Sequence, residues 1–240
     1  MSYALASWLD SLGLKPAALI GHSIGEYAAA CHAGVMPLDD ALAAVVARGQ
    51  AMAEQPPGAM LAVRLGADEL RARLPEGIDI AGINAPTLTV VAGPFEAIDS
   101  LAKTLEASEV HCTRLRVSHA FHSASMDGAL PRVQAALAKA PLGAPRLPVY
   151  SCVSGAPLTA AEATDPGYWA RQVRAPVRFS QAVQAELAQG ECVFLEVGPG
   201  QALSALVRQH RSAQNAVPRC LALLGPANQP GEPAAHALAT

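Results

Sequence analysis

The sequence predicts an α/β fold in which a small unit of strands and helices interrupts a larger layer of alternating elements. Two observations support this fold class. A short apolar run breaks at Gly21 and a helix-forming stretch follows at once, which indicates a strand, a tight turn and a helix. The order of expected elements then changes to βαββαβ between residues 58 and 118, and an α/β alternation resumes afterwards.

The first 57 residues are expected to form the start of the larger body. Residues 3–12 place apolar side chains at helical spacing, and residues 17–20 form a short apolar strand. The stretch 26–31 favours a second helix. A third helix is expected to begin with Asp39 as its N-cap and to end near Glu54, because two prolines follow there.

The segment 58–118 predicts a separate small subdomain. Its strands are expected at 59–65, 78–83, 88–92 and 112–117, and its helices at 68–74 and 95–107. This βαββαβ order is that of the split βαβ, or ferredoxin-like, motif. Because the motif begins and ends between elements of a different type, it predicts an insertion into a body formed by residues 1–57 and 119–227.

The second half of the body continues the alternation of helices and strands. Helices are expected at 126–138 and 180–188, and strands at 149–152 and 193–197. The tail 228–240, rich in Gly, Pro and Ala, has no periodic apolar face and predicts a linker or disordered segment.

Composition narrows the class of protein. The chain is 51% apolar and carries a formal charge of −3, without a run of Lys or Arg, so it shows no electrostatic footprint for nucleic acid or an anionic membrane. No segment approaches the roughly 18 apolar residues of a membrane span, and no basic leader is present, so a cytoplasmic location is expected. The five cysteines form neither a CxxC pair nor a Cys/His cluster, so no metal site is expected.

The segment Gly21-His22-Ser23-Ile24-Gly25 has the GxSxG form of a nucleophile elbow, and it lies between the expected strand and helix as such an elbow requires. Glycines on either side allow a sharp turn, and the Ser23 hydroxyl would project at the helix N-terminus. There the Ile24 amide could face a developing oxyanion. The alternative is a Gly-rich turn in which the serine only caps a helix.

A serine nucleophile needs a base, and the chain has seven histidines. His119 and His122 stand out because they lie in the loop between the small subdomain and the next helix, where side chains can enter a cleft. Either could instead be a surface histidine. His22 is adjacent to Ser23, so its side chain is expected to point away from the reacting oxygen and to serve in packing or hydrogen bonding.

Arg48 lies within a helix whose other inward positions are apolar. Its planar guanidinium binds a carboxylate through two parallel hydrogen bonds, which suits an acidic acyl substrate such as a malonyl group. The alternative is a snorkelling or salt-bridged surface arginine.

A series of longer segments then points to one enzyme family. They are GHSIGEYAAACHAGV, ARGQAM, PPGAMLAV, INAPTLTVVAG, VSHAFHS, DPGYWARQVRAPVRF and FLEVGPG. In these segments, which occur in the family's order over most of the chain, the sequence resembles the malonyl-CoA:acyl carrier protein transacylases and the acyltransferase domains of modular (type I) polyketide synthases. The resemblance implies a hydrolase-like α/β body with an inserted ferredoxin-like subdomain, in agreement with the division drawn above.

The resemblance also assigns roles to individual residues. Ser23 takes the nucleophile position and His122 the base position, while Arg48 takes the position that pairs with the substrate carboxylate. Gln172 matches the residue whose backbone carbonyl orients the histidine, which implies a Ser-His dyad without a carboxylate. Asn84 matches a polar position of the small subdomain beside the cleft.

Residues 119–122, His-Ala-Phe-His, resemble the malonyl-selective form of a family motif that distinguishes extender units. His119 and Phe121 are therefore implied to contact substrate, as is Ile24 through its amide. Phe121 would crowd the space that an α-methyl group needs. One methyl group in a pocket is worth roughly 1 to 3 kcal/mol, so the implied preference is incomplete.

The implied reaction moves a malonyl group from coenzyme A to the phosphopantetheine thiol of an acyl carrier protein through an acyl-serine, without a permanently bound cofactor. The implied partners are the carrier protein and neighbouring polyketide synthase domains. The family's first strand and its Gly-Gln-Gly loop, whose glutamine helps build the oxyanion hole, have no counterpart here, which predicts an N-terminally truncated chain.

Two alternatives stay open. One is a thioesterase of the α/β-hydrolase type, which needs the chain order serine, acid, late histidine and would have to use His210 or His236. The other is an inactive truncated acyltransferase fragment, because loss of one oxyanion donor costs about 10²–10³ in rate.

Overall fold

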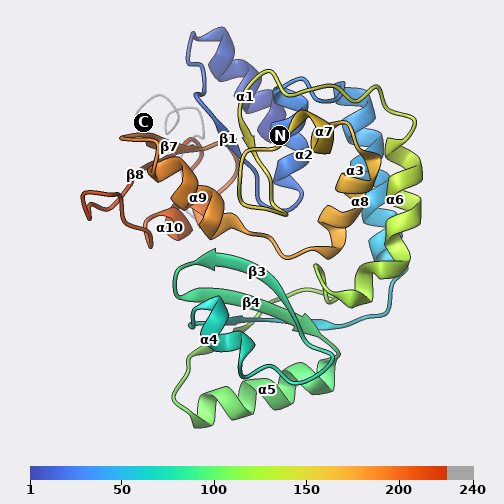
Figure 1. Cartoon of the computed structure of the whole chain (residues 1–240), viewed down its shortest axis with the longest axis vertical. Helices are drawn as coiled ribbons and strands as arrows, with labels where there is room; N and C mark the ends of the chain where they lie inside the picture. Colours follow the sequence, from blue (N-terminus) through green and yellow to red (C-terminus); the bar gives the residue numbers. More distant parts are fainter. Residues whose placement is uncertain (226–240) are drawn as a thin grey trace.

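The structure, a computed structural model, describes residues 1–225. Figure 1 shows a larger body that contains the N-terminus and a smaller part beneath it, built around strands β3 and β4. The smaller part contains β2 (Ala59–Val63), α4 (Ala67–Arg71), β3 (Asp79–Ala85), β4 (Leu88–Gly93), α5 (Phe95–Ala107) and β5 (Cys112–Arg114). Across residues 1–225, every helix is too short or too polar to span a membrane.

The body alternates helices with short strands. Its elements are α1 (Ser2–Ser11), β1 (Leu19–Ile20), α2 (Gly25–His32), α3 (Leu38–Ala53), the 3-10 helix η1 (Ala124–Ala129), α6 (Leu130–Leu137), β6 (Val149–Tyr150), α7 (Ala160–Ala163), α8 (Pro166–Arg174), α9 (Phe179–Leu187), β7 (Val193–Glu196), α10 (Ala202–Val207) and β8 (Arg219–Ala222). Strand β1 pairs in parallel with β6, and β7 pairs in parallel with β8. The predicted α/β class with parallel pairing is therefore confirmed.

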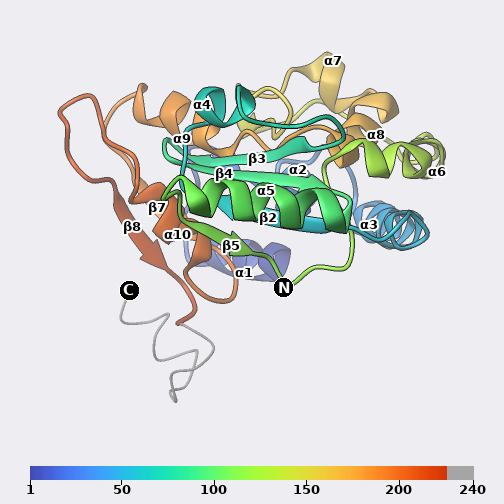
Figure 2. The same cartoon turned by 90° about the horizontal axis from the view of Figure 1, so that it is seen from below.

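The small part is a four-stranded antiparallel sheet in the order β3-β4-β2-β5. With its two helices this is the ferredoxin-like arrangement predicted from the element order. The period of two along β2 separates the faces of the sheet. Leu61 and Val63 pack with Ile98 of α5, whereas Met60 lies on the opposite face with Val90 and Ala120. In Figure 2, α5 runs along the side of this sheet that faces away from the body.

The body has its own core, which centres on the aromatic side chains of α2 and α8. The rings of Tyr27 and Trp169 are 5.1 Å apart, and both residues are fully buried. Helices α3 and α6 complete this cluster with small and aliphatic side chains such as Ala44 and Val133. This packing fixes the helices that carry the candidate site residues.

The body and the small sheet are joined by backbone hydrogen bonds. The Ile83 amide donates to the Val177 carbonyl at 2.8 Å, and the Val177 amide donates to the Ala81 carbonyl at 2.9 Å. The segment before α9 thus pairs in parallel with β3, next to it in the sheet. It brings residues 175–177 to the place where the two parts meet.

The structure corrects some sequence predictions. Asp39 does not cap α3: the N-cap is Pro37 without a side-chain hydrogen bond, and Asp39 lies in the first turn, where its charge favours the helix dipole. The sequence patterns also do not predict helices α7, α8 and α10 or strand β8, all of which the structure contains. The tail 228–240 lies outside the described residues.

Candidate active site

Ser23 lies in the turn between β1 and α2, as the elbow motif predicts. Its backbone has a φ of 54°, a left-handed conformation that is uncommon for a serine and typical of strained functional turns. Gly21 makes the turn possible, because a Cβ at this position would lie 2.2 Å from the backbone nitrogen of Glu26. The Ser23 carbonyl accepts hydrogen bonds from the Glu26 amide at 3.1 Å and from Gln172 Nε2 at 2.7 Å.

His122 meets Ser23 across the junction of the two parts. Its Nε2 lies 2.7 Å from Ser23 Oγ, and its Nδ1 lies 2.9 Å from the carbonyl oxygen of Ala175. A carbonyl can only accept, so Nδ1 carries the proton and Nε2 is free to accept the serine proton. The backbone of His122 is also left-handed, with a φ of 58°.

The acceptor that orients His122 differs in part from the one implied by resemblance. The resemblance implies the backbone carbonyl of Gln172, but the hydrogen bond at 2.9 Å goes to Ala175. The Gln172 backbone also raises the pKa of His122, though less than Ala175 does. The side chain of Gln172 is occupied elsewhere, because its amide holds the Ser23 carbonyl.

The imidazole of His122 is a neutral base at ordinary pH. Burial lowers the pKa of His122 to about 4, and the positive charge of Arg48 contributes to that shift, against the opposing effect of the Ala175 carbonyl. The residue is 5% exposed. A neutral imidazole with its free nitrogen at the serine hydroxyl is the arrangement that general base catalysis requires.

Arg48 projects from α3 into the same site. Its Nη2 donates to Ser23 Oγ at 3.1 Å, and its guanidinium carbon lies 5.9 Å from the centre of the Tyr27 ring. The residue is buried, so the snorkelling alternative is wrong. Within residues 1–225 no carboxylate forms an ion pair with Arg48, and its buried Nε has no hydrogen-bond partner. A desolvated guanidinium with a free N–H is prepared to receive an anion.

These side chains open onto a cavity of about 330 Å³ between the body and the small sheet. Its lining is mostly apolar, and its members are His22, Ser23, Ile24, Arg48, Met52, Met60, Ala81, Gly82, Asn84, Val90, Leu115, Phe121, His122 and Val177. A small apolar chamber with a few convergent polar groups is the usual form of a small-molecule site.

The remaining predicted site residues fall into two groups. Ile24, Phe121 and Asn84 line the cavity, and the side-chain oxygen Oδ1 of Asn84 lies 2.9 Å from His22 Nε2. His22 therefore has the hydrogen-bonding role that the sequence predicts for it. His119 does not line the cavity: its Nδ1 lies 2.7 Å from the Ser118 hydroxyl, and its ring packs 5.8 Å from that of Phe121. The ring of His119 therefore contacts Phe121, which lines the cavity, and does not contact the cavity itself.

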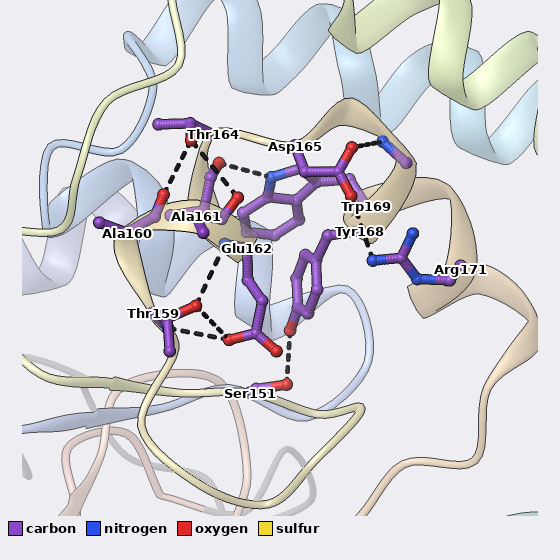
Figure 3. Close-up of polar contacts among 12 residues, drawn as sticks. Ser151, Thr159, Ala160, Ala161, Glu162, Thr164, Asp165, Tyr168, Trp169 and Arg171 are labelled. Atoms are coloured by element: carbon purple, nitrogen blue, oxygen red, sulfur yellow. Dashed lines mark hydrogen bonds and ion pairs between the residues drawn. The ribbon is translucent and has the colours of Figure 1, made fainter.

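Helix α8, which the sequence patterns did not predict, carries Gln172 and Tyr168 to the site. Asp165 caps the helix by accepting from the Gly167 amide at 2.8 Å, and Pro166 occupies the first turn. Figure 3 shows this cap, together with the indole N–H of Trp169 donating to the Ala163 carbonyl and the hydroxyl of Tyr168 directed at Ser151. An Asp-Pro pair before a helix is a recognisable start signal and could have revealed α8.

A buried polar network behind the nucleophile was also missed. Glu26 is fully buried and receives hydrogen bonds from the Tyr168 hydroxyl and from Gln172 Nε2, the latter at 3.1 Å. Tyr168 also lies 2.7 Å from Ser151 Oγ. Glu26 directly follows the GxSxG segment, but its position inside a helix gave no signal of burial. Among the residues placed by the structure, no cluster of His, Cys, Asp and Glu could hold a metal ion.

Comparisons with known proteins identify the family of this chain. The family described as the acyl transferase domain matches residues 1–236. The polyketide synthase GfsA of Streptomyces halstedii is 43% identical over 209 residues, which cover 85% of this chain and 3% of that protein. The chain thus spans a small fraction of the length of the curated relatives it matches.

Solved structures show the same fold. The acyl transferase domain of SpnD, in complex with 2-(pent-4-yn-1-yl)malonyl, superposes with a TM-score of 0.93 at 36% identity, covering 99% of this chain and 57% of that one. The malonyl CoA-acyl carrier protein transacylase of Clostridium perfringens gives a TM-score of 0.84 at 26% identity over 92% of this chain and 71% of its own. The chain belongs to the acyl transferase domain family.

Proposed function

We propose that this chain transfers a malonyl group from malonyl-CoA to the phosphopantetheine thiol of an acyl carrier protein, as an extender-unit step of polyketide biosynthesis. One observation carries the proposal. Ser23 Oγ lies 2.7 Å from a neutral imidazole and 3.1 Å from a buried guanidinium that has no carboxylate partner among the described residues. The first group activates a nucleophile, and the second selects an acyl group that bears a negative charge.

In the first half-reaction, Ser23 Oγ attacks the thioester carbonyl while His122 Nε2 takes the hydroxyl proton. The tetrahedral intermediate collapses, the carbon–sulfur bond breaks, and the coenzyme A thiolate leaves with the proton from His122. An ester between the malonyl group and Ser23 remains. Arg48 holds the malonyl carboxylate through its unpartnered Nε–H and one hydrogen of Nη2, while the other Nη2 hydrogen is directed at Ser23 Oγ.

In the second half-reaction, the carrier thiol gives its proton to His122 and attacks the acyl-serine carbonyl. The ester bond breaks, and Ser23 leaves with the proton from His122. Neutral His122 is restored at the end of each half-reaction, because Nε2 gives up the proton that it took. The Nδ1–H group donates its hydrogen bond to the Ala175 carbonyl throughout. This sequence predicts ping-pong kinetics.

The backbone amide of Ile24 is our candidate for stabilising the oxyanion. The amides of Gly25, Glu26 and Tyr27 donate to carbonyls of the same turn, whereas within the described chain the Ile24 amide has no acceptor. It lies at the N-terminus of α2, where the helix dipole favours negative charge. One such donor contributes about 10²–10³ in rate.

Selection of malonyl over methylmalonyl is assigned to Phe121. Its side chain forms part of the cavity wall together with Met60 and Leu115, so an α-substituent would have to displace an aromatic ring. His119 supports that ring from outside the cavity. We propose Asn84 as a polar anchor of the cavity wall, held by its hydrogen bond with His22.

The geometry does not favour the thioesterase alternative. His122 bonds to a backbone carbonyl, so no carboxylate of the described chain takes the third position of a hydrolase triad. The late histidine His210 is buried against Ser180, 2.9 Å from its hydroxyl, and does not line the cavity. His236 lies outside the described residues.

Several further features belong to the same proposal. The partners would be an acyl carrier protein and neighbouring polyketide synthase domains, with phosphopantetheine brought by the carrier and no cofactor held permanently. The reaction would take place in the cytoplasm. We also propose residues 58–118 as the small subdomain and residues 1–57 with 119–227 as the body.

The second half-reaction distinguishes transferase from hydrolase. The malonylated protein would be isolated and mixed with a phosphopantetheinylated carrier protein or with buffer alone. The proposal expects rapid appearance of malonyl-carrier and slow release of free malonate. Equal loss of the acyl group in both samples, with no malonyl-carrier formed, would contradict it.

A further inference from the structure

The fully buried carboxyl group of Glu26 has no role in the proton transfers described above, yet it lies three residues from the nucleophile. A buried carboxyl group is costly unless hydrogen bonds compensate it. Burial accordingly raises the pKa of Glu26, while the bonds from Tyr168, Cys152 and Gln172 oppose that effect. The positions of these donors indicate whether the site favours the ionised or the protonated form of Glu26.

The hydrogen-bond partners along the network identify where each hydroxyl proton lies. Ser151 Oγ accepts from the Val153 and Ser154 amides at 3.0 and 3.1 Å, so both of its lone pairs are used. Its own proton is therefore available to Tyr168, 2.7 Å away. The Tyr168 proton is then free for the first oxygen of Glu26.

The second oxygen of Glu26 accepts from Gln172 Nε2 at 3.1 Å. The same amide nitrogen donates its other hydrogen to the Ser23 carbonyl at 2.7 Å. A rotated amide would place an oxygen against two acceptors, so Glu26 determines how the Gln172 amide is turned. With both oxygens accepting, the arrangement suits an ionised Glu26. Burial lowers the pKa of Arg48, and the charge of Glu26 opposes that effect.

We propose that Glu26 is a positioning residue for the nucleophile: held by Tyr168, it turns the Gln172 amide toward the Ser23 carbonyl and so fixes Ser23 in the left-handed conformation that directs its hydroxyl at His122. This inference rests on the proposed function only in taking Ser23 as the nucleophile. A left-handed serine is conformationally unfavourable, so it persists when its surroundings hold it. Within the described chain, the bond from Gln172 Nε2 is the one side-chain hydrogen bond that the Ser23 carbonyl accepts, and it holds the backbone of Ser23 in place.

The test measures Ser23 itself with a fluorophosphonate probe. Ser23 Oγ attacks phosphorus, fluoride leaves, and His122 takes the serine proton, so no coenzyme A substrate is involved. In Glu26→Gln, the new side-chain nitrogen would face either the Gln172 nitrogen or the Tyr168 hydroxyl. One of the two hydrogen bonds that Glu26 accepts is then lost. We expect the labelling rate constant to fall at least about tenfold, the effect of one lost hydrogen bond with a displaced nucleophile.

A positioning role and a structural role differ in what they change. Positioning lowers the rate constant while every molecule is eventually labelled and the pH midpoint of labelling stays that of His122. Loss of fold lowers the labelled fraction and leaves the rate of the folded molecules unchanged. Glu186→Gln is the matched control, because Glu186 also accepts from a tyrosine, Tyr150 at 2.9 Å, away from the cavity.

If Glu26→Gln does not fold, Tyr168→Phe decides, with Tyr150→Phe as its control. Slower labelling of Tyr168→Phe than of Tyr150→Phe, at full labelled fraction, supports the inference. A wild-type labelling rate constant in folded Glu26→Gln overturns the inference. If Glu26→Gln does not fold, a wild-type labelling rate constant in Tyr168→Phe overturns it. A wild-type protein that reacts with the probe but not with malonyl-CoA contradicts the proposed function alone, and the variant rates still decide the role of Glu26.

Discussion

Ser23 and His122 are brought within hydrogen-bond distance, 2.7 Å, by two backbone turns that are both left-handed, with φ values of 54° and 58°. One turn belongs to the body and the other to the segment that leaves the small sheet. Neither conformation is favourable for its residue type, so both depend on their surroundings. The distance between the two side chains therefore depends on the correct joining of the two parts.

The protonation state of His122 sets an acidic limit to activity. A protonated imidazole cannot take the serine proton, so the acylation rate falls as pH drops through a pKa of about 4. Labelling of Ser23 with a neutral reagent over a pH series measures this limit without titrating the substrate. A midpoint near the ordinary histidine value of 6.5 would contradict the role of burial.

The charge of Arg48 contributes to the same limit. Since Arg48 lowers the pKa of His122, replacing it by a neutral residue should move the midpoint of the labelling profile upward. Arg48→Gln and the wild type would be compared in the same pH series. Arg132→Gln is the control, because this arginine lies on the surface and bonds to Glu54. An unchanged midpoint in Arg48→Gln would show that the two charges do not interact.

Arg48 should also distinguish acyl groups by charge. Arg48→Ala is expected to slow malonyl loading about 10- to 100-fold, because the two-pronged contact with the malonyl carboxylate is lost, and to leave acetyl loading similar or faster. Intact-protein mass spectra taken over time with each thioester give both rates. Equal losses for malonyl and acetyl groups would remove Arg48 from carboxylate recognition.

Phe121 is predicted to limit the size of the α-substituent. Phe121→Ser enlarges the cavity wall and should raise the ratio of methylmalonyl to malonyl loading about tenfold, since one methyl group is worth roughly 1 to 3 kcal/mol in a pocket. The matched control is Phe95→Ser, at the surface of α5. Competition between the two thioesters in one tube measures the ratio directly. A ratio that does not move would assign selectivity to another part of the wall.

The two glycines of the elbow are predicted to differ. Gly21→Ala would place a Cβ 2.2 Å from the Glu26 backbone nitrogen, whereas a Cβ at position 25 meets nothing within 4 Å. Thermal unfolding followed by circular dichroism should show a lower Tm for Gly21→Ala. Gly25→Ala should be unchanged or more stable, because alanine favours the helix by about 1 kcal/mol. The reverse order would contradict the turn geometry.

Much of this structure could be predicted where a local signal coincided with the fold. The βαββαβ order appeared because each strand and helix of the small sheet has its own apolar period, and α5 was placed from Phe95 to Ala107 as observed. Ser23 was found because the GxSxG pattern lies between an expected strand and an expected helix, although only Gly21 is required by the space in the turn. The misplaced cap at Asp39 shows the limit, because an acidic residue in the first turn resembles a cap in sequence.

The rest of the site depends on tertiary contacts that no local pattern encodes. The carbonyl that orients His122 comes from Ala175, whose side chain carries no information about this role. Glu26 and Tyr168 are 142 positions apart and meet only because α2 and α8 pack together. His119 shows the converse difficulty: it shares a loop with His122, yet only His122 lines the cavity, whereas His119 contacts Ser118 and the ring of Phe121.

The central claim is that Ser23 becomes malonylated in this site. Intact-protein mass spectrometry after mixing the chain with malonyl-CoA tests it most directly, with Ser23→Ala alongside. We predict the mass increase of one malonyl group on the wild type and none on the variant. A wild type that gains no malonyl mass, or an equal gain on Ser23→Ala, would contradict the claim.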